Sequence, residues 1–244
     1  MFELRWVPLP VLQKAITEKA HREIALFLFF KMTTSGRVKI EGRKKEEVLQ
    51  VLSISESTLY RRLKVLMSWD WIGYDGKYEV YYIRGFKRIY EIEEEFISKT
   101  AVWIRVEDLF HLQAFSFSAW LGYLLRAQCR GKRRGAGQKT RCSQQSPASI
   151  FKPVALSVME QFFSLSKDTL IKLKNHSIRK GYIERERGYQ ELHSISDHTY
   201  EYYKIYPEHW GRLRKIMTDT GWAIALTAPD TFIDYNRYKR KRYR

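Results

Sequence analysis

The stretch that decides the fold is LSISESTLYR at residues 52–61, which returns as FSLSKDTLIK at residues 163–172. The two stretches align without a gap at an offset of 111 residues, and the alignment continues to Trp71-Ile72 over Tyr182-Ile183. A repeat at this spacing has the size of a compact domain. The sequence therefore predicts one structural unit that occurs twice.

Each copy has the pattern of a helix, a tight turn and a second helix. Amphipathic segments at residues 44–51 and 154–163 precede a Ser-apolar-Ser turn in both copies. The second serine of each turn, Ser55 or Ser166, stands where its side chain can accept a backbone N–H of the following helix. We therefore expect a helix to begin after each of these serines.

The two second helices share an apolar stripe but differ on their outer faces. Leucines recur at helical spacing in both copies, and the residues expected to face the core are Leu59, Leu63 and Leu66, then Leu170, Leu173 and Ile178. The outer face of the first helix carries Ser57, Tyr60, Arg61 and Lys64, with Thr58 and Arg62 toward its margins. The outer face of the second carries Lys167, Asp168, Lys172 and Asn175. Such faces can read bases in a major groove, and the two copies should read different sequences.

A shift to strand-like alternation follows each second helix. Residues 71–74 and 77–83 flank Asp75-Gly76, which predicts a β-hairpin with an Asp-Gly turn. Residues 182–189 repeat the arrangement with Gly188 at the turn. Each copy is therefore expected to end in a hairpin.

This combination resembles winged helix-turn-helix DNA-binding proteins. The resemblance implies an α+β fold of two tandem domains, each a three-helix core with a β-hairpin wing. We expect the first domain at residues 1–105, the second at 106–218 with a basic loop at 126–152, and a basic tail at 219–244. Two such domains in one basic chain are also similar in architecture to replication initiators of plasmids and phages.

The resemblance also implies which residues contact DNA. By position, base contacts would come from the second helix of each copy: Ser57, Thr58, Tyr60, Arg61, Lys64, Lys167, Asp168, Thr169, Lys172 and Asn175. Asp168 departs from the usual basic or hydroxyl contact and can serve instead as a favourable charge at the helix start. The wider set of candidate contacts adds residues beside these helices and on the wings: Ser55, Arg62, Lys77, Lys174, Arg185 and Arg187.

Positive charge is concentrated outside the repeats. The chain carries a formal charge of +17, residues 109–159 contain no Asp or Glu, and residues 235–244 contain six Lys or Arg. A surplus of this size favours a polyanionic partner. We expect a flexible basic loop and a basic arm to attract phosphates independently of sequence, through Arg130, Lys132, Arg133, Arg134, Lys239, Arg240, Lys241 and Arg242. Both runs could alternatively be solvated segments with no role.

The remaining segments are expected to connect or complete the two domains. The sequence predicts strands at residues 89–97, 100–106 and 198–205, a helix at roughly 106–128 and a closing helix at 207–217. The acidic residues near position 93 should face away from nucleic acid or hold the basic segments in the unbound protein.

Several other classes of protein are disfavoured. Cys129 and Cys142 lack zinc-ligand spacing, and we expect free thiols. His176 and Arg179 match a His-x-x-Arg pair of recombinases, but they lie in the repeated helix without partner residues, so we expect no catalysis, metal or cofactor. The apolar stretches are too short or interrupted to span a bilayer, and the N-terminus lacks signal-peptide order, which favours a cytoplasmic protein without membrane contact.

The expected function is sequence-specific binding of duplex DNA, either in replication initiation or in transcription regulation. The alternative is an RNA-binding or nucleic-acid-packaging protein that binds mainly through its basic loop and tail. A tandem chain can imitate a dimer without forming one, so the sequence leaves the oligomeric state open.

Overall fold

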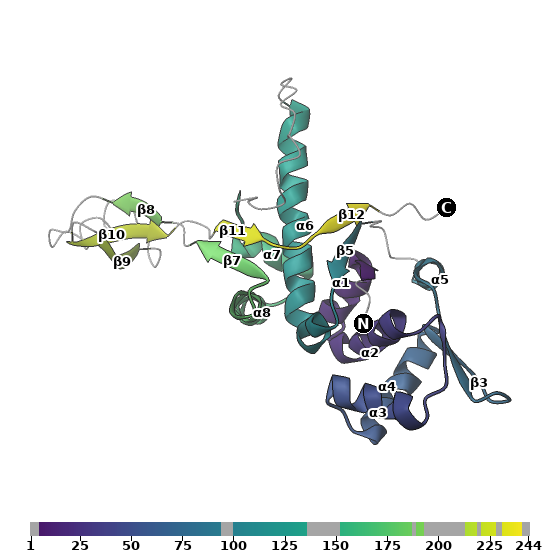
Figure 1. Cartoon of the computed structure of the whole chain (residues 1–244). Coiled ribbons are helices and arrows are strands. Elements are labelled where there is room, and N and C mark those ends of the chain that lie inside the picture. Colours follow the sequence, from purple (N-terminus) through teal and green to yellow (C-terminus); the bar gives the residue numbers. More distant parts are fainter. Residues whose placement is uncertain are drawn as a thin grey trace.

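The structure is a computed structural model that describes residues 5–93, 100–135, 152–186, 189–192, 213–218, 221–227 and 231–240. It mixes helices and strands, as the sequence predicts (Figure 1). The elements of the first part of the chain are β1 Arg5–Pro8, α1 Leu9–Thr17, α2 His21–Thr33, β2 Arg37–Val38, α3 Gly42–Leu52, α4 Glu56–Ser68, β3 Ile72–Asp75, β4 Val80–Ile83 and α5 Phe86–Ile92.

The elements of the second part begin with a strand that belongs to a shared sheet. They are β5 Thr100–Ile104, a 3-10 helix Glu107–His111, α6 Leu112–Gly135, β6 Lys152–Pro153, α7 Leu156–Phe163, α8 Lys167–Arg179, β7 Ile183–Glu186, β8 Tyr189–Leu192, β9 Leu213–Thr218, β10 Gly221–Thr227, β11 Thr231–Asp234 and β12 Tyr238–Arg240.

The order of elements repeats in the two halves. In the first unit α2 leads through β2 to α3 and α4, and a sheet of order β2-β4-β3 completes it. In the second unit α6 leads through β6 to α7 and α8, and the sheet has the order β6-β11-β7. The sequence repeat is therefore also a repeat of secondary structure.

The two turns between the helices repeat in backbone conformation and in their caps. Ser53 and Ser164 both adopt the left-handed conformation, with φ of 48° and 51°. Ser55 Oγ accepts the N–H of Thr58 at 3.3 Å, and Ser166 Oγ accepts the N–H of Thr169 at 3.4 Å. Both predicted helix starts are confirmed, because each serine satisfies a backbone donor that the first helical turn leaves without a partner.

The predicted core stripes are also confirmed. Leu59, Leu63 and Leu66 on α4 are buried against α2, and in the second unit Leu170 and Leu173 are buried while Ile178 is partly buried. Both units are held in one hydrophobic core, since α1 packs on α6 and α6 in turn packs on α8.

The first hairpin forms, but its turn differs from the predicted one. β3 pairs with β4 from Ile72↔Ile83 to Asp75↔Val80, which leaves residues 76–79 in the loop. The left-handed residue is Glu79, with φ 54°, and Gly76 has no positive φ. Asp75 Oδ1 instead accepts the N–H of Lys77 at 2.9 Å, so a side-chain turn replaces the predicted Asp-Gly turn.

The predicted second hairpin is wrong. β7 pairs with β11, from Ile183↔Asp234 to Glu186↔Thr231, and not with β8 directly after it. β8 pairs with β10 in a separate sheet of order β8-β10-β9 (Figure 1). The physical reason is burial: β11 covers the second unit with Phe232, which is buried, and Gly188 lies outside the described residues.

The predictions for the connecting segments have mixed outcomes. The predicted strand at 100–106 is confirmed as β5. The predicted strand at 89–97 is wrong where the structure describes it, because residues 86–92 form the helix α5, which buries Ile89. Residues 213–217 of the predicted closing helix lie instead in β9, which pairs antiparallel with β10. The predicted strand at 198–205 and the acidic residues from 94 lie outside the described residues.

The first part of the predicted basic loop and part of the predicted tail lie in regular elements, while residues 136–151 of the loop lie outside the described residues. α6 continues to Gly135, so Arg126, Arg130, Lys132, Arg133 and Arg134 belong to a helix rather than a flexible loop. The reason is that an otherwise helix-favouring run outweighs the cost of Gly131. The C-terminal segment contains β10, β11 and β12, and β12 pairs with β5 in a sheet of order β1-β5-β12. Residues 238–240 are therefore held in a sheet and do not form a free arm.

No helix in the described part of the chain combines the length and the apolar character that crossing a membrane requires.

Candidate nucleic-acid interface

The exposed face of α4 carries most of the residues predicted for the first unit. Ser55, Ser57, Tyr60, Arg61 and Lys64 are exposed, and Thr58 is half-buried. Ser55 Oγ also lies 3.1 Å from Ser57 Oγ, so the cap and the first turn form a small cluster of hydroxyl groups at the helix N-terminus. Hydroxyl groups and the partial positive charge of a helix N-terminus suit a phosphate, while Arg61 and Lys64 suit a base edge or a phosphate.

Arg62 is the exception on this helix. It was predicted at the margin of the outer face, but the structure buries it, with 8% of its surface exposed. Its Nη1 donates to the carbonyl of Arg22 on α2 at 3.5 Å, and its Nε has no hydrogen-bond partner. The difference arises because α2 packs across this side of α4, which helical periodicity within α4 cannot show.

The second unit presents a similar but sparser face on α8. Lys167, Lys172 and Asn175 are exposed, and so is Asp168 in the first turn. Thr169 is half-buried, and its hydroxyl lies 2.9 Å from Ser166 Oγ.

Two predicted contacts of the second unit lie beside this face. Lys174 is half-buried, with its Nζ 6.0 Å from the centre of the Phe232 ring on β11. Arg185 on β7 is half-buried as well. Both side chains are thus less exposed than Lys167, Lys172 and Asn175 on the outer face of α8.

The first hairpin reaches outward from its unit (Figure 1), and its loop carries a basic and an aromatic residue. Lys77 and Tyr78 are exposed in the loop, with the Lys77 Nζ 5.2 Å from the centre of the Tyr78 ring. Such a tip offers a cation and a flat ring to a neighbouring groove or phosphate.

Some of the basic residues outside the repeats lie in α6 or β12, and others lie outside the described residues. Arg130, Lys132, Arg133 and Arg134 lie on the last turns of α6, which extends beyond the packed part of both units (Figure 1). On β12, Lys239 is exposed, with its Nζ 5.8 Å from the centre of the Trp6 ring, and Arg240 closes the strand. Arg187, Lys241 and Arg242 lie outside the described residues.

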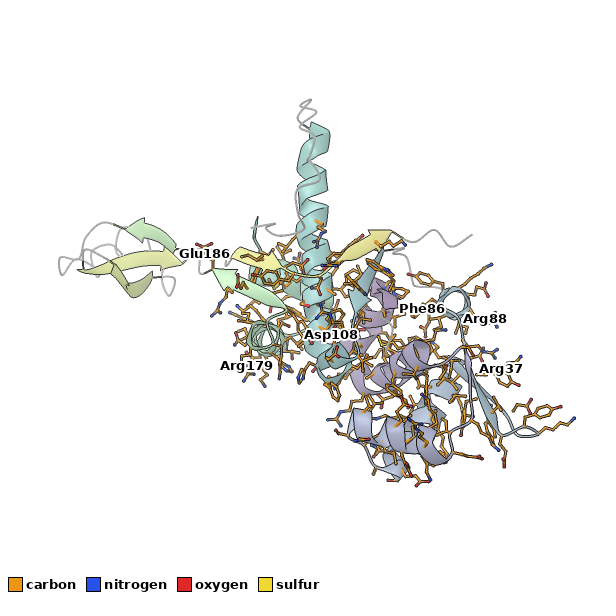
Figure 2. All side chains as sticks on the ribbon, viewed as in Figure 1. Arg37, Phe86, Arg88, Asp108, Arg179 and Glu186 are labelled. Carbon is orange, nitrogen blue, oxygen red and sulfur yellow. The ribbon has the colours of Figure 1, made fainter. Side chains whose placement is uncertain are left out.

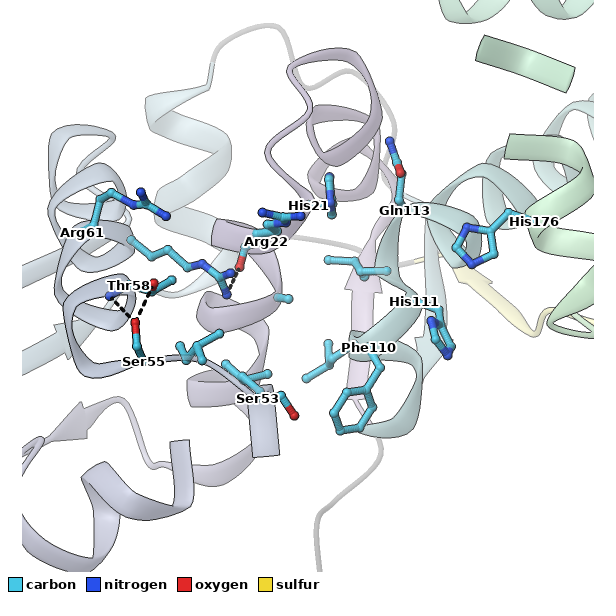
Figure 3. Close-up of a pocket in the computed structure, with 16 residues that line it drawn as sticks. His21, Arg22, Ser53, Ser55, Thr58, Arg61, Phe110, His111, Gln113 and His176 are labelled. Carbon is cyan, nitrogen blue, oxygen red and sulfur yellow. Dashed lines mark hydrogen bonds between the residues drawn. The ribbon is translucent and has the colours of Figure 1, made fainter. Parts of the chain in front are cut away.

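A groove of ≈ 680 Å³ lies on the surface where the two units meet. Figure 3 shows Ser55, Thr58 and Arg61 on one side and His111 and His176 on the other, with Arg22 and His21 between them. The cationic or titratable side chains that line it are His21, Arg22, Arg61, Arg62, His111 and His176, and no Asp or Glu is among its described lining residues. The groove is therefore a positively charged surface shared by both units.

Sequence reasoning missed this groove. Arg22 and His21 open α2, and His111 ends the 3-10 helix before α6, so these residues carry no common motif. Only the packing of the two units brings them near the α3–α4 turn. The one available signal was the absence of acidic residues between positions 109 and 159, a stretch that includes His111.

The histidines of the groove are biased toward their neutral forms. Burial lowers the pKa of His21, and the adjacent Arg22 lowers it further. Burial also lowers the pKa of His176, as does His111, whose ring centre lies 5.8 Å away. An anion in the groove would oppose this bias by stabilising the protonated rings.

The chain matches no known protein family, and it shows no significant similarity to a curated protein or to a solved structure.

Proposed function

We propose that the chain binds duplex DNA through two winged helix-turn-helix units, with α4 and α8 as the helices that enter the major groove. The observation that carries the proposal is the repeat itself: both units place a serine-capped helix after a left-handed serine turn and complete it with a three-stranded sheet. A helix, a turn and a second helix beside a sheet is the arrangement by which such domains present a recognition helix. The first unit adds a hairpin wing, whereas in the second unit β11 from the C-terminal segment takes the place of the hairpin strand.

The dimensions and the chemistry of α4 suit this role. The helix has 13 residues, and a helix with its side chains is about 10–12 Å wide, which fits a major groove about 12 Å wide. The guanidinium of Arg61 can donate to O6 and N7 of one guanine. Ser55 and Ser57 at the helix N-terminus can hold a backbone phosphate, which would position the helix in the groove.

The two units would read unlike parts of one site. Where α4 presents Tyr60 and Arg61, α8 presents Ile171 and Lys172 at the matching positions. The hydrogen-bonding groups at these positions therefore differ, and we expect an asymmetric target sequence rather than an inverted repeat.

The basic residues outside the recognition helices would add affinity without sequence preference. The end of α6 and the exposed Lys239 on β12 offer cations beyond the two helix faces. Neutralising phosphates releases counterions, so this part of the binding should weaken steeply as salt rises.

The decisive experiment is selection of bound sequences from a random duplex pool with the full chain. We expect a defined motif to be enriched, and Arg61→Ala to weaken binding by roughly 5- to 150-fold and to relax the preference at one base pair. Arg88→Ala is the matched control, since Arg88 is exposed on α5 at the outer edge of the molecule (Figure 2). Recovery of no motif would contradict the proposal.

A second candidate function follows from the basic end of α6. This segment extends beyond both units and carries four cations, so it could bind nucleic acid without help from α4 or α8. An RNA-binding or packaging protein of this kind would bind RNA and DNA about equally, and Arg61→Ala would leave its affinity unchanged.

Within the DNA-binding proposal, footprints around the chain's own gene would separate a replication initiator, which should show repeated sites, from a transcription regulator, which should show one operator.

A further inference from the structure

Arg62 stands at a position that the repeat assigns to the hydrophobic core. At the offset of 111 residues its counterpart is Leu173, which is 4% exposed, and Arg62 itself is 8% exposed. A guanidinium group at a buried position loses hydration that an aliphatic side chain never had. The first unit therefore carries a buried charge where its own repeat shows that leucine suffices.

The protein compensates this charge incompletely. Within the described residues no ion pair involves Arg62, and its one hydrogen bond is the 3.5 Å contact of Nη1 with the Arg22 carbonyl. Its Nε is buried without a partner. Burial lowers the pKa of Arg62, and Arg22 and Arg61 lower it further against the opposing charge of Glu23. The guanidinium group therefore lacks most of the partners that its five N–H donors could bind.

These donors line a site with further affinity for an anion. Arg62 lines the groove between the units together with Arg22 and Arg61, and the groove extends to the N-terminus of α4, which Ser55 caps. His21 lines it too, and its Nδ1 is buried without a hydrogen-bond partner. Guanidinium groups and a helix N-terminus are the groups that proteins use to bind phosphate.

We propose that the groove between the two units binds a phosphate group, held by Arg62 with Arg22 and the N-terminus of α4. The volume of ≈ 680 Å³ leaves room for the sugars on either side of a phosphodiester. The proposal deepens the DNA-binding function where the phosphate belongs to a duplex backbone, and in that form it rests on that function.

The first arm of the test titrates inorganic phosphate into the full chain at constant ionic strength, with chloride as the comparison anion. The variant is Arg62→Leu, which copies the residue that the repeat tolerates at this position, and Arg62→Met is the second variant should the branched side chain not pack. Arg88→Leu is the control, because the same exchange occurs there on exposed α5. Circular dichroism and a thermal melt establish that each variant is folded.

We expect saturable phosphate binding that weakens by about 10-fold or more in Arg62→Leu, the loss typical of one charge-assisted hydrogen bond, and that persists in Arg88→Leu. The second arm measures duplex affinity against salt. If the phosphate belongs to a duplex backbone, a plot of log binding constant against log salt concentration becomes less steep by about 0.9 in Arg62→Leu. The change is the same for selected and random duplexes. An unchanged slope together with lost phosphate binding identifies a free phosphate as the ligand.

The inference is overturned if Arg62→Leu changes neither phosphate binding nor the salt slope, or if Arg88→Leu changes them equally. The DNA-binding proposal fails separately. Absence of any duplex binding by the wild-type chain, with phosphate binding lost in Arg62→Leu, would remove that proposal and leave the phosphate site standing.

Discussion

Replacing Gly122 by alanine should detach the C-terminal strands from α6. Gly122 lies on α6 where the chain from β11 to β12 crosses it, and a Cβ atom there would overlap the carboxylate of Asp234 and the hydroxyl of Tyr238. Asp234 is 2% exposed and pairs with Arg126, one turn further along α6. Tyr238 donates to the carbonyl of Ala119 at 2.6 Å. The glycine therefore permits a close approach that any side chain would block.

The magnitude follows from two opposing effects. Glycine to alanine within a helix stabilises it by about 1 kcal/mol when nothing else changes. Moving the buried Asp234 carboxylate away from Arg126 costs about 3–5 kcal/mol, because it leaves a charge without its partner. We expect Gly122→Ala to lower the free energy of unfolding by about 2–4 kcal/mol, and the melting temperature by roughly 4–16 °C for a chain of this size.

The assay is urea unfolding and a thermal melt followed by circular dichroism. Gly76→Ala is the control, since the Cβ there would meet only a Tyr74 ring carbon at 3.8 Å. In an Asp234→Ala background the cost of Gly122→Ala should shrink by about 1 kcal/mol or more, because the main obstacle is gone. A Gly122→Ala protein that is more stable than the wild type would refute this description of the contact.

Two further predictions concern the caps and the groove. Ser55→Ala should lower the free energy of unfolding by about 1 kcal/mol, because α4 loses its N-terminal cap. Ser68→Ala, at the exposed end of the same helix, is the control and should change the free energy of unfolding very little. Equal urea midpoints for the two variants would contradict this prediction. Burial and Arg22 hold the pKa of His21 below its usual value of about 6.5; Arg62 acts in the same direction and Glu23 opposes it. The unfolded chain therefore binds a proton at His21 more readily than the folded chain does. Unfolding free energy, measured between pH 7.5 and 5.5, should therefore fall as the pH drops, and fall less in His21→Gln; identical pH profiles would refute the assignment.

The features that could be predicted from the sequence depend on residues within one or two helical turns. Ser55 and Ser166 cap their helices because the acceptor and the N–H are three positions apart. Leu59, Leu63 and Leu66 share one face because helical geometry places them there. The repeat at an offset of 111 residues is likewise visible without coordinates.

The predictions that failed depended on partners distant in the chain. Ile183 pairs with Asp234 rather than with the strand directly after it, because burial of Phe232 and the Arg126–Asp234 pair favours β11 over the shorter connection. A local hairpin pattern contains no information on that competition.

The sequence by itself determined that a serine-capped helix pair occurs twice and that the chain is strongly basic. Only the tertiary structure decided that β12 joins a sheet with β5, that α2 buries Arg62, and that both units line one positively charged groove. The physical reason is that caps and helical faces form within a few residues, whereas burial and charge at Arg62 depend on elements brought together by the whole fold.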